Sequence, residues 1–142
     1  MIDIFRGEYR YLSNYYEAPV IFEGRLYMNS ESAYQAAKIE NNEDRWAFED
    51  TPPNLAKKLG QKAPLREDWD DVKDEIMYRI VKDKFTRNID LGKKLVETYP
   101  EELIEGNNWH DNYWGICNCH RCKGGLNKLG KILERVREEL MV

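Results

Sequence analysis

The sequence predicts an α+β fold, a mainly helical single domain over residues 1–142 with a small antiparallel sheet. Residues 68–88 carry Val, Ile and Phe at helical spacing, which indicates a long amphipathic helix. Residues 19–27 place β-branched and aromatic residues on both sides of Glu23-Gly24, which is typical of a tight hairpin. A chain of 142 residues is long enough for one domain with a substantial core.

The elements that precede the long helix are short. Ile2–Phe5 has the composition of a strand, and the hairpin at 19–27 follows it. A helix is predicted over 30–38, with Ser30 as its N-cap, because serine is a favoured residue at that position. Another short helix is predicted at 43–50.

A further helix is predicted to open at Thr51-Pro52-Pro53, since proline is favoured in a first turn, and to close at Gly60. After the long helix, the chain reads as a helix at 90–98 and a short strand at 103–105. Residues 106–125 read as an irregular loop, and residues 126–140 as an amphipathic helix.

Composition restricts the classes of function. Charged residues make up 34% of the chain with acids and bases interleaved, and the net charge of −4 argues against broad electrostatic capture of nucleic acid. Nine tyrosines and four tryptophans favour a site that stacks flat rings. The sequence shows no signal peptide and no apolar run of membrane-spanning length, and its three cysteines are clustered. We therefore expect a reducing, cytoplasmic location, no membrane and no disulfide scaffold.

The helix at 30–38 has an unusual polar face. Residues three and four apart are neighbours on a helix, so one face carries Glu31, Tyr34, Gln35 and Lys38. The other sides carry small alanines where an ordinary surface helix has larger apolar residues. This pattern predicts close packing, with the polar face turned to something other than bulk water.

Two further segments mix aromatic and polar residues. Residues 107–115 hold two tryptophans, a tyrosine, a histidine and an aspartate, and such loops are often functional. The alternative is that Trp109 and Trp114 fill the core while Asp111 caps a turn. Residues 9–16 offer Ser13 and Asn14, which would otherwise form a turn between aromatic core residues.

In order and spacing, these segments resemble the NADAR, or YbiA-like, family over nearly the whole chain. The matches are Leu12-Ser13-Asn14-Tyr15, Ser30-Glu31 with Tyr34-Gln35 and Lys38, Lys84-Phe85 with Asn88, Asp111-Asn-Tyr113-Trp114-Gly115, and Asn127 with Leu129-Gly130. The resemblance implies a YbiA-like fold and an N-glycosidase that cleaves a ribose C1′–N bond. Described activities act on phosphoribosylamino-pyrimidine intermediates of riboflavin synthesis, or remove ADP-ribose from guanine in nucleic acid.

Such cleavage builds positive charge on the ribose ring, and a carboxylate beside C1′ stabilises that charge and activates water. Glu31, in the first turn of its helix, suits that role because the helix dipole favours its ionised form. Lys38 would either hold a phosphate or sugar hydroxyl or attack C1′ as an amine. Asp111 would hold ribose hydroxyls or share the acid–base work. Candidate substrate-binding residues are Ser13, Asn14, Tyr34, Gln35, Tyr113 and Trp114.

Three points stay open at the level of sequence. Many relatives have an acidic residue directly after the Trp-Gly pair, where this chain has Ile116. Arg6, Arg10 and Lys123 are candidate phosphate contacts that nothing separates from ordinary surface charges. A module that binds NAD or ADP-ribose without cleaving it, or a scaffold with these residues in its core, would use the same side chains.

The cysteine cluster admits two interpretations. Cys117, Cys119 and Cys122, with His110 or His120, have the composition of a Cys₃His zinc site. The alternative is three free thiols, which is favoured slightly because two separated ligand pairs are absent. No cofactor is expected to be required, and a structural zinc is the one candidate.

Overall fold

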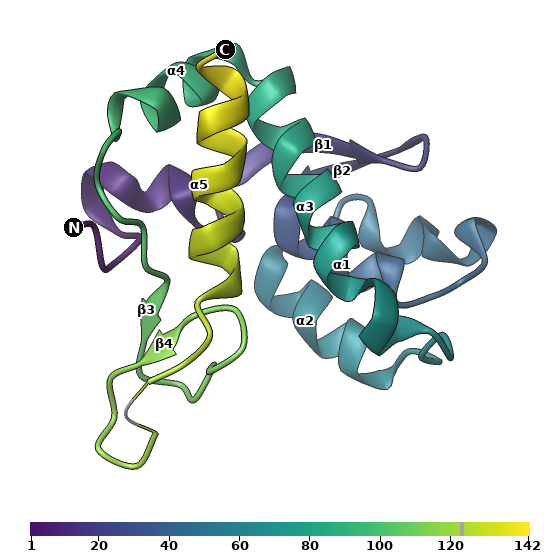
Figure 1. Cartoon of the computed structure of the whole chain (residues 1–142). Coiled ribbons are helices and arrows are strands. Elements are labelled where there is room, and N and C mark those ends of the chain that lie inside the picture. The colour runs from purple at the N-terminus through teal and green to yellow at the C-terminus, as the bar shows by residue number, and fades with distance from the viewer. Residues whose placement is uncertain (123) are drawn as a thin grey trace. The chain divides into compact units, whose positions relative to one another are not determined.

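The computed structural model describes residues 1–122 and 124–142, and it confirms a mainly helical α+β fold with a small antiparallel sheet (Figure 1). Lys123, one of the candidate phosphate contacts, lies outside the described residues. Backbone contacts group the chain into two compact units, Asn14–Ile89 and Met1–Ser13 with Asp90–Val142. The single domain stays a prediction.

The unit Asn14–Ile89 begins with the predicted hairpin. Strands β1 (Glu17–Phe22) and β2 (Arg25–Asn29) pair antiparallel. The turn residues Glu23 and Gly24 have φ values of 48° and 81°. Two positive φ values in a two-residue turn match the right-handed twist of the strands, which is why glycine is favoured here. Exposed and buried residues alternate along β1, so one face of the hairpin is covered.

Helix α1 (Ser30–Ala37) follows β2 directly and is buried at every residue. Its N-cap is Asn29, whose side chain accepts a 2.7 Å hydrogen bond from Ser32 N. The prediction of Ser30 as N-cap is therefore wrong by one residue, because the last residue of β2 is itself a capping residue. The helix contacts β1, β2 and the neighbouring helices of its unit, as its small alanines predicted.

Three helices complete this unit. They are the 3₁₀ helix η2 (Asn42–Phe48), α2 (Pro53–Lys62) and α3 (Trp69–Arg87). Helix α3 confirms the predicted long helix and buries Ile76, Ile80 and Phe85. Helix α2 does not close at Gly60, which lies inside it. A Cβ at Gly60 would overlap the side-chain amide of Gln35, so this glycine allows a close approach to α1.

The other unit contains the 3₁₀ helix η1 (Gly7–Leu12), most of α4 (Ile89–Glu97), and α5 (Lys128–Leu140). Helix α5 begins two residues later than predicted, because Asn127 adopts a left-handed conformation with φ of 51°. The Asn127 side chain accepts a hydrogen bond from Glu105 N and donates one to Leu103 O. It thereby fixes the start of α5 against the preceding loop.

Regular strand structure is sparse in this unit. Strands β3 (Gly106–Asn107) and β4 (Ile116–Cys117) pair in parallel, so the prediction of an irregular loop is wrong for these four residues. They are too short to show a period-2 pattern. The strands predicted at 2–5 and 103–105 reduce to one parallel bridge between Ile2 and Leu103.

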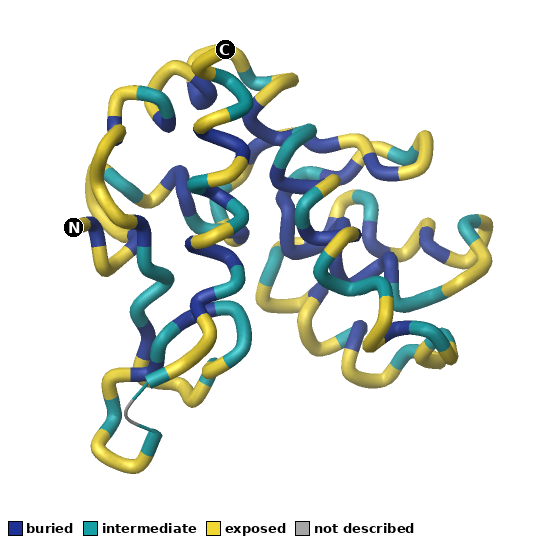
Figure 2. Tube along the Cα trace, in the orientation of Figure 1, coloured by how far each residue is buried: buried dark blue, intermediate teal, exposed yellow. Residues whose placement is uncertain are grey.

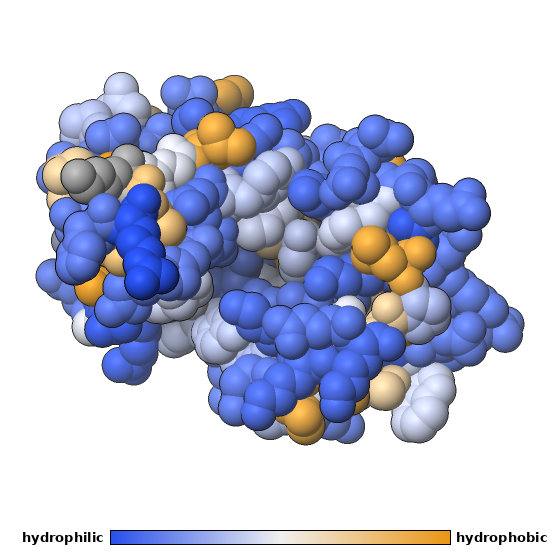
Figure 3. Space-filling view, turned by 90° about the horizontal axis from the view of Figure 1, so that it is seen from below, coloured by the Kyte–Doolittle hydropathy of each residue, from blue (hydrophilic) through white to orange (hydrophobic). Residues whose placement is uncertain are grey.

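Burial follows the helices of each unit, as the tube coloured by burial shows (Figure 2). On the face seen in Figure 3, hydrophilic residues predominate and hydrophobic ones form small separate groups, as expected for a chain in which 34% of residues are charged. Among the described residues, no helix combines the length and apolarity that crossing a membrane requires.

Candidate functional site

The polar face of α1 is buried and held in place. Glu31 is 9% exposed, and Gln35 Nε2 donates a 2.6 Å hydrogen bond to its Oε2. The two residues are four apart, so the helix itself sets their distance. The backbone of Gly60, on α2, packs against the Gln35 side chain. The Glu31 carboxylate is therefore held by a neighbour that is itself fixed.

Asn14, which precedes strand β1, contacts Glu31 through the main chain. Its backbone oxygen accepts a 3.1 Å hydrogen bond from Glu31 N, and its buried amide donates to Met77 Sδ at 3.5 Å. The next residue, Tyr15, has its pKa raised by burial and by the negative charge of Glu31. The structure thus brings Asn14, Gln35 and Glu31 together.

Lys38 follows the last residue of α1, as its C-cap. Burial lowers the pKa of its amine, the charge of Glu31 opposes that shift, and Lys57 and Lys73 add to it. Lys38 therefore lies within electrostatic range of Glu31. A lowered pKa increases the fraction of neutral amine, which is the form that can act as a nucleophile.

Tyr34, a predicted base-stacking residue, is 7% exposed and packs against Trp69 of α3. Their ring centroids are 5.1 Å apart with the planes tilted by 54°. This contact fixes the Tyr34 ring within its own unit. Its contact with a base stays a prediction.

Sequence reasoning missed Lys84 as a chemical group. Its side chain is 1% exposed, and burial lowers its pKa to about 7. Its amine lies 5.8 Å from the Tyr16 ring centroid and 5.0 Å from that of Phe85. A signal was present, since Lys84 stands four residues after Ile80 in the buried stripe of α3. A lysine in such a stripe predicts a buried amine.

The remaining predicted residues lie in the other unit. Asp111 Oδ1 accepts hydrogen bonds from Tyr113 N at 3.1 Å and Trp114 N at 2.9 Å, which is the turn-capping role of the alternative interpretation. The Tyr113 and Trp114 rings meet edge to face, 4.9 Å apart. Trp109 is 49% exposed, so the interpretation that it fills the core is wrong.

Asn107, the last residue of β3, forms two side-chain hydrogen bonds with the main chain of Asp111. Its Oδ1 accepts from Asp111 N at 3.1 Å and its Nδ2 donates to Asp111 O at 2.9 Å. Ser13 is half-buried, and its backbone N donates to Arg10 O. Arg6 and Arg10 are exposed, as surface charges would be. Ile116, the residue directly after the Trp-Gly pair, is part of β4.

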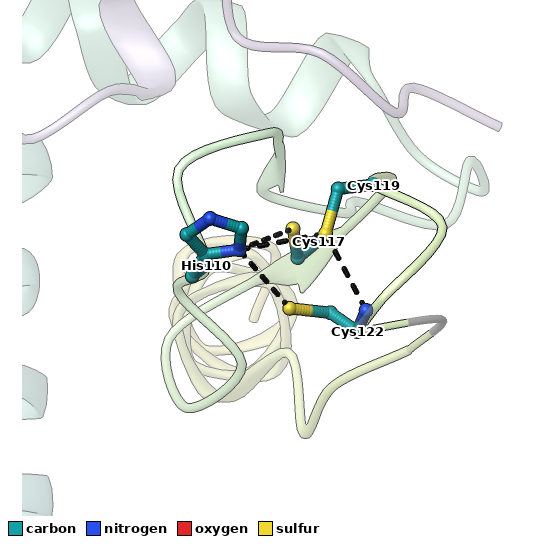
Figure 4. Close-up of side chains that lie close together, drawn as sticks. All are labelled: His110, Cys117, Cys119 and Cys122. Atoms are coloured by element: carbon teal, nitrogen blue, oxygen red, sulfur yellow. Dashed lines mark hydrogen bonds between the residues drawn. The ribbon is translucent and has the colours of Figure 1, made fainter.

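A second cluster gathers metal-ligating atoms beside this turn. His110 Nδ1 and the sulfurs of the three cysteines all lie within 4.8 Å of one another (Figure 4). The Nδ1–Sγ distances are 3.9 Å to Cys117, 3.4 Å to Cys119 and 3.3 Å to Cys122. His110, rather than His120, is the histidine of the group. This set has the composition of a zinc site.

Comparisons with known proteins place the chain in a family. Residues 4–141 match the model of the NADAR domain. The chain is similar to N-glycosidase YbiA of Escherichia coli, with 30% identity over 95% of this chain and 84% of that protein. It is also similar to an N-glycosidase of Nostoc punctiforme, with 35% identity over 93% of this chain and 86% of that one.

Two further comparisons agree. The chain is 33% identical to a riboflavin biosynthesis protein of Vibrio vulnificus over 92% of its own length, which is 35% of that protein. The NMR structure of Escherichia coli YbiA superimposes with a TM-score of 0.84, covering 99% of this chain and 85% of that one. The protein is accordingly an N-glycosyl hydrolase, as its full-length relatives are named. Fold, sequence and domain model lead to one conclusion: the chain belongs to the NADAR family.

Proposed function

We propose that this N-glycosidase cleaves the ribose C1′–N bond of an ADP-ribosylated nucleobase such as ADP-ribosyl-guanine, or of a phosphoribosylamino-pyrimidine intermediate of riboflavin synthesis. The riboflavin biosynthesis relative of Vibrio vulnificus supports the second substrate. The observation that carries the proposal is the buried carboxylate of Glu31, oriented by Gln35 at 2.6 Å. A carboxylate held this way costs little reorganisation when charge develops beside it.

In this proposal Glu31 acts on both the ribose and the water. Positive charge grows on C1′ and the ring oxygen as the C1′–N bond breaks, and the carboxylate stabilises it. Glu31 then accepts a proton from water, whose oxygen bonds to C1′. The base leaves with the bonding electrons and takes up a proton. The products are the free base and a ribosyl compound with a hydroxyl at C1′.

Lys38 offers a covalent route to the same products. Its amine, with its lowered pKa, attacks C1′ as the base leaves, and the ring oxygen takes up a proton as the ribose opens to an imine. Water then hydrolyses the imine and restores the amine. Borohydride reduces an imine to a stable amine, so a Lys38-dependent adduct after reduction identifies this route. Full turnover without an adduct supports direct attack by water.

Binding of the substrate is assigned to the remaining predicted residues. In this proposal Tyr34, Tyr113 and Trp114 stack the base, and Ser13, Asn14 and Gln35 bind phosphate, ribose or base edges. Asp111 contacts ribose hydroxyls in addition to capping its turn. We place the protein in the cytoplasm, where its three cysteines, which form no disulfide, stay reduced.

A product assay tests the function. The wild-type protein is incubated with ADP-ribosyl-guanine and, separately, with a phosphoribosylamino-pyrimidine, and the released base is identified by chromatography and mass spectrometry. We expect release of free base from at least one of the two. Binding of both, measured by calorimetry, with no release from either would contradict the proposed substrates and favour a binding module.

A further inference from the structure

We propose that His110, Cys117, Cys119 and Cys122 bind a single Zn²⁺ ion that fixes the fold of the surrounding loop. His110 directly precedes Asp111, Cys117 lies in strand β4, and Cys119 and Cys122 lie in the turn that follows β4. Figure 4 shows their side chains converging on one point, with His110 on one side and the cysteines on the other. None of these four residues is among those proposed above to act on the substrate, although His110 directly precedes Asp111.

The distances fit tetrahedral zinc. With Zn–S bonds of about 2.3 Å and a Zn–N bond of about 2.1 Å, tetrahedral angles place each sulfur about 3.6 Å from the histidine nitrogen. The three observed Nδ1–Sγ distances, 3.3, 3.4 and 3.9 Å, lie on both sides of that value. All four atoms lie within 4.8 Å of one another, so one ion between them would contact all four once the sulfurs draw closer together.

The ligand set also indicates what the ion does. Three thiolates and an imidazole fill all four positions of tetrahedral zinc, whereas catalytic sites keep one position for water or substrate. Soft sulfur ligands select zinc over magnesium or calcium, which prefer oxygen. The site is therefore structural.

The backbone around the cluster supports the ligands. Cys122 N lies 3.4 Å from Cys119 Sγ and donates to it, an arrangement that stabilises a negatively charged sulfur. Cys117 N donates to Gly124 O, which returns the chain beside β4. His110 has a φ of 70°, a left-handed conformation that is uncommon for a residue with a side chain. This conformation turns the imidazole toward the sulfurs.

A bound ion explains how the loop keeps its shape. In the described part of residues 106–125, regular strand pairing involves only the four residues of β3 and β4. His110 directly precedes Asp111, and Cys117 follows Trp114 by three positions. An ion bound by both closes the segment that presents Tyr113 and Trp114. Bound zinc would thus stabilise one conformation of this loop, as packing against neighbouring elements stabilises a helix.

Metal content is the first test. The full chain is purified with a reducing agent and without chelator, and its zinc is measured by elemental mass spectrometry. We expect one zinc per chain in the wild type and in His120→Ala, the matched control from the same loop. His110→Ala and Cys119→Ser should lose most of it. Substoichiometric zinc in the wild type, or equal loss in the His110 and His120 variants, would overturn the inference.

Cobalt substitution keeps the test independent of variants that fail to fold. Zinc is removed from the wild-type protein with a chelator, and Co²⁺ is titrated into it under reducing conditions. Saturation at one equivalent, with a thiolate-to-metal charge-transfer band and a higher melting temperature, is expected. Absence of that band refutes thiolate ligation. Because neither readout uses substrate, this outcome is independent of the proposed N-glycosidase chemistry.

Discussion

In helix α1 the backbone fixes the polar side chains, whereas between Asn107 and Cys122 the side chains fix the backbone. Glu31 and Gln35 meet because the helix places residues four apart on one face, and the helix is buried along its whole length. Asp111 and Asn107 instead use their side chains to close a turn with little regular structure. We infer that zinc completes that closure.

This difference indicates where chemistry is more readily placed. A carboxylate on a buried helix is oriented before substrate arrives, which favours electrostatic catalysis. A carboxylate that accepts hydrogen bonds from two backbone N–H groups, as Asp111 does, is needed by its own turn. We therefore propose that Glu31, rather than Asp111, acts at the reacting carbon. The following changes test that division, from the largest expected effect to the smallest.

Glu31→Ala should lower kcat by about 10²–10⁴-fold, because it removes the group that activates water. Release of free base under saturating substrate is the measurement, with the free energy of unfolding measured in parallel by urea. Glu40→Ala, which removes an exposed carboxylate just beyond the same helix, is the matched control and should keep full activity. Equal activity in the two variants would contradict the assignment of Glu31 as the carboxylate that activates water.

Lys84→Met should change how stability depends on pH. The pKa of Lys84 is lowered from 10.5 to about 7 by burial, so between these values the unfolded state holds a proton that the folded state lacks. The free energy of unfolding of the wild type should therefore rise with pH from 7 to 10.5, relative to Lys84→Met. The full difference is about 3–5 kcal/mol.

Urea unfolding at pH 7 and at pH 9.5 measures this slope for wild type and variant. Lys93→Met, at an exposed position on α4, should leave the slope of the wild type unchanged. Parallel stability curves for the wild type and Lys84→Met would show that the buried amine does not carry the effect.

Asn127→Ala should lower the free energy of unfolding by about 2–4 kcal/mol, because the two groups at 103 and 105 lose their buried hydrogen-bond partner. Alanine also fits the left-handed φ of 51° poorly. Asn127→Gly separates these causes, since glycine accepts the φ but restores neither bond. A glycine variant as stable as the wild type would assign the whole effect to the backbone.

Gly60→Ala should lower kcat/KM by about tenfold, because the new methyl group displaces the Gln35 amide that orients Glu31. Alanine is the better helix former by about 1 kcal/mol, so this loss is not expected to follow from unfolding. A double-mutant cycle with Gln35→Ala tests whether Gly60→Ala lowers kcat/KM through the Gln35 side chain. If the two losses add fully, Gly60 does not act through Gln35.

The sequence predicted α1, α3 and the hairpin well because each has a strong local pattern. The polar face of Glu31 and Gln35 followed from helical spacing, and its burial followed from the alanines beside it. Boundaries failed where tertiary contacts decide, as at Gly60, which looked like a helix end and is a packing site. Asn127 delays α5 through bonds to residues more than twenty positions away.

The parallel pair β3–β4 and the buried amine of Lys84 escaped prediction for the same reason. Two-residue strands carry no periodic signal, and the burial of a lysine depends on the elements packed against it. The cysteine spacing suggested zinc, but only the fold chooses His110 over His120. Local pattern therefore predicted the polar face of α1, and tertiary structure was needed to identify the histidine beside the three cysteines.

A structure of the protein bound to ADP-ribose tests the central claim most directly. The quantity to measure is the distance from ribose C1′ to the nearest carboxylate oxygen of Glu31. We expect C1′ to lie in near-attack contact, within about 3–4 Å of that oxygen or of a water that it binds. A complex in which C1′ lies beside Asp111, out of reach of both Glu31 and Lys38, would contradict it.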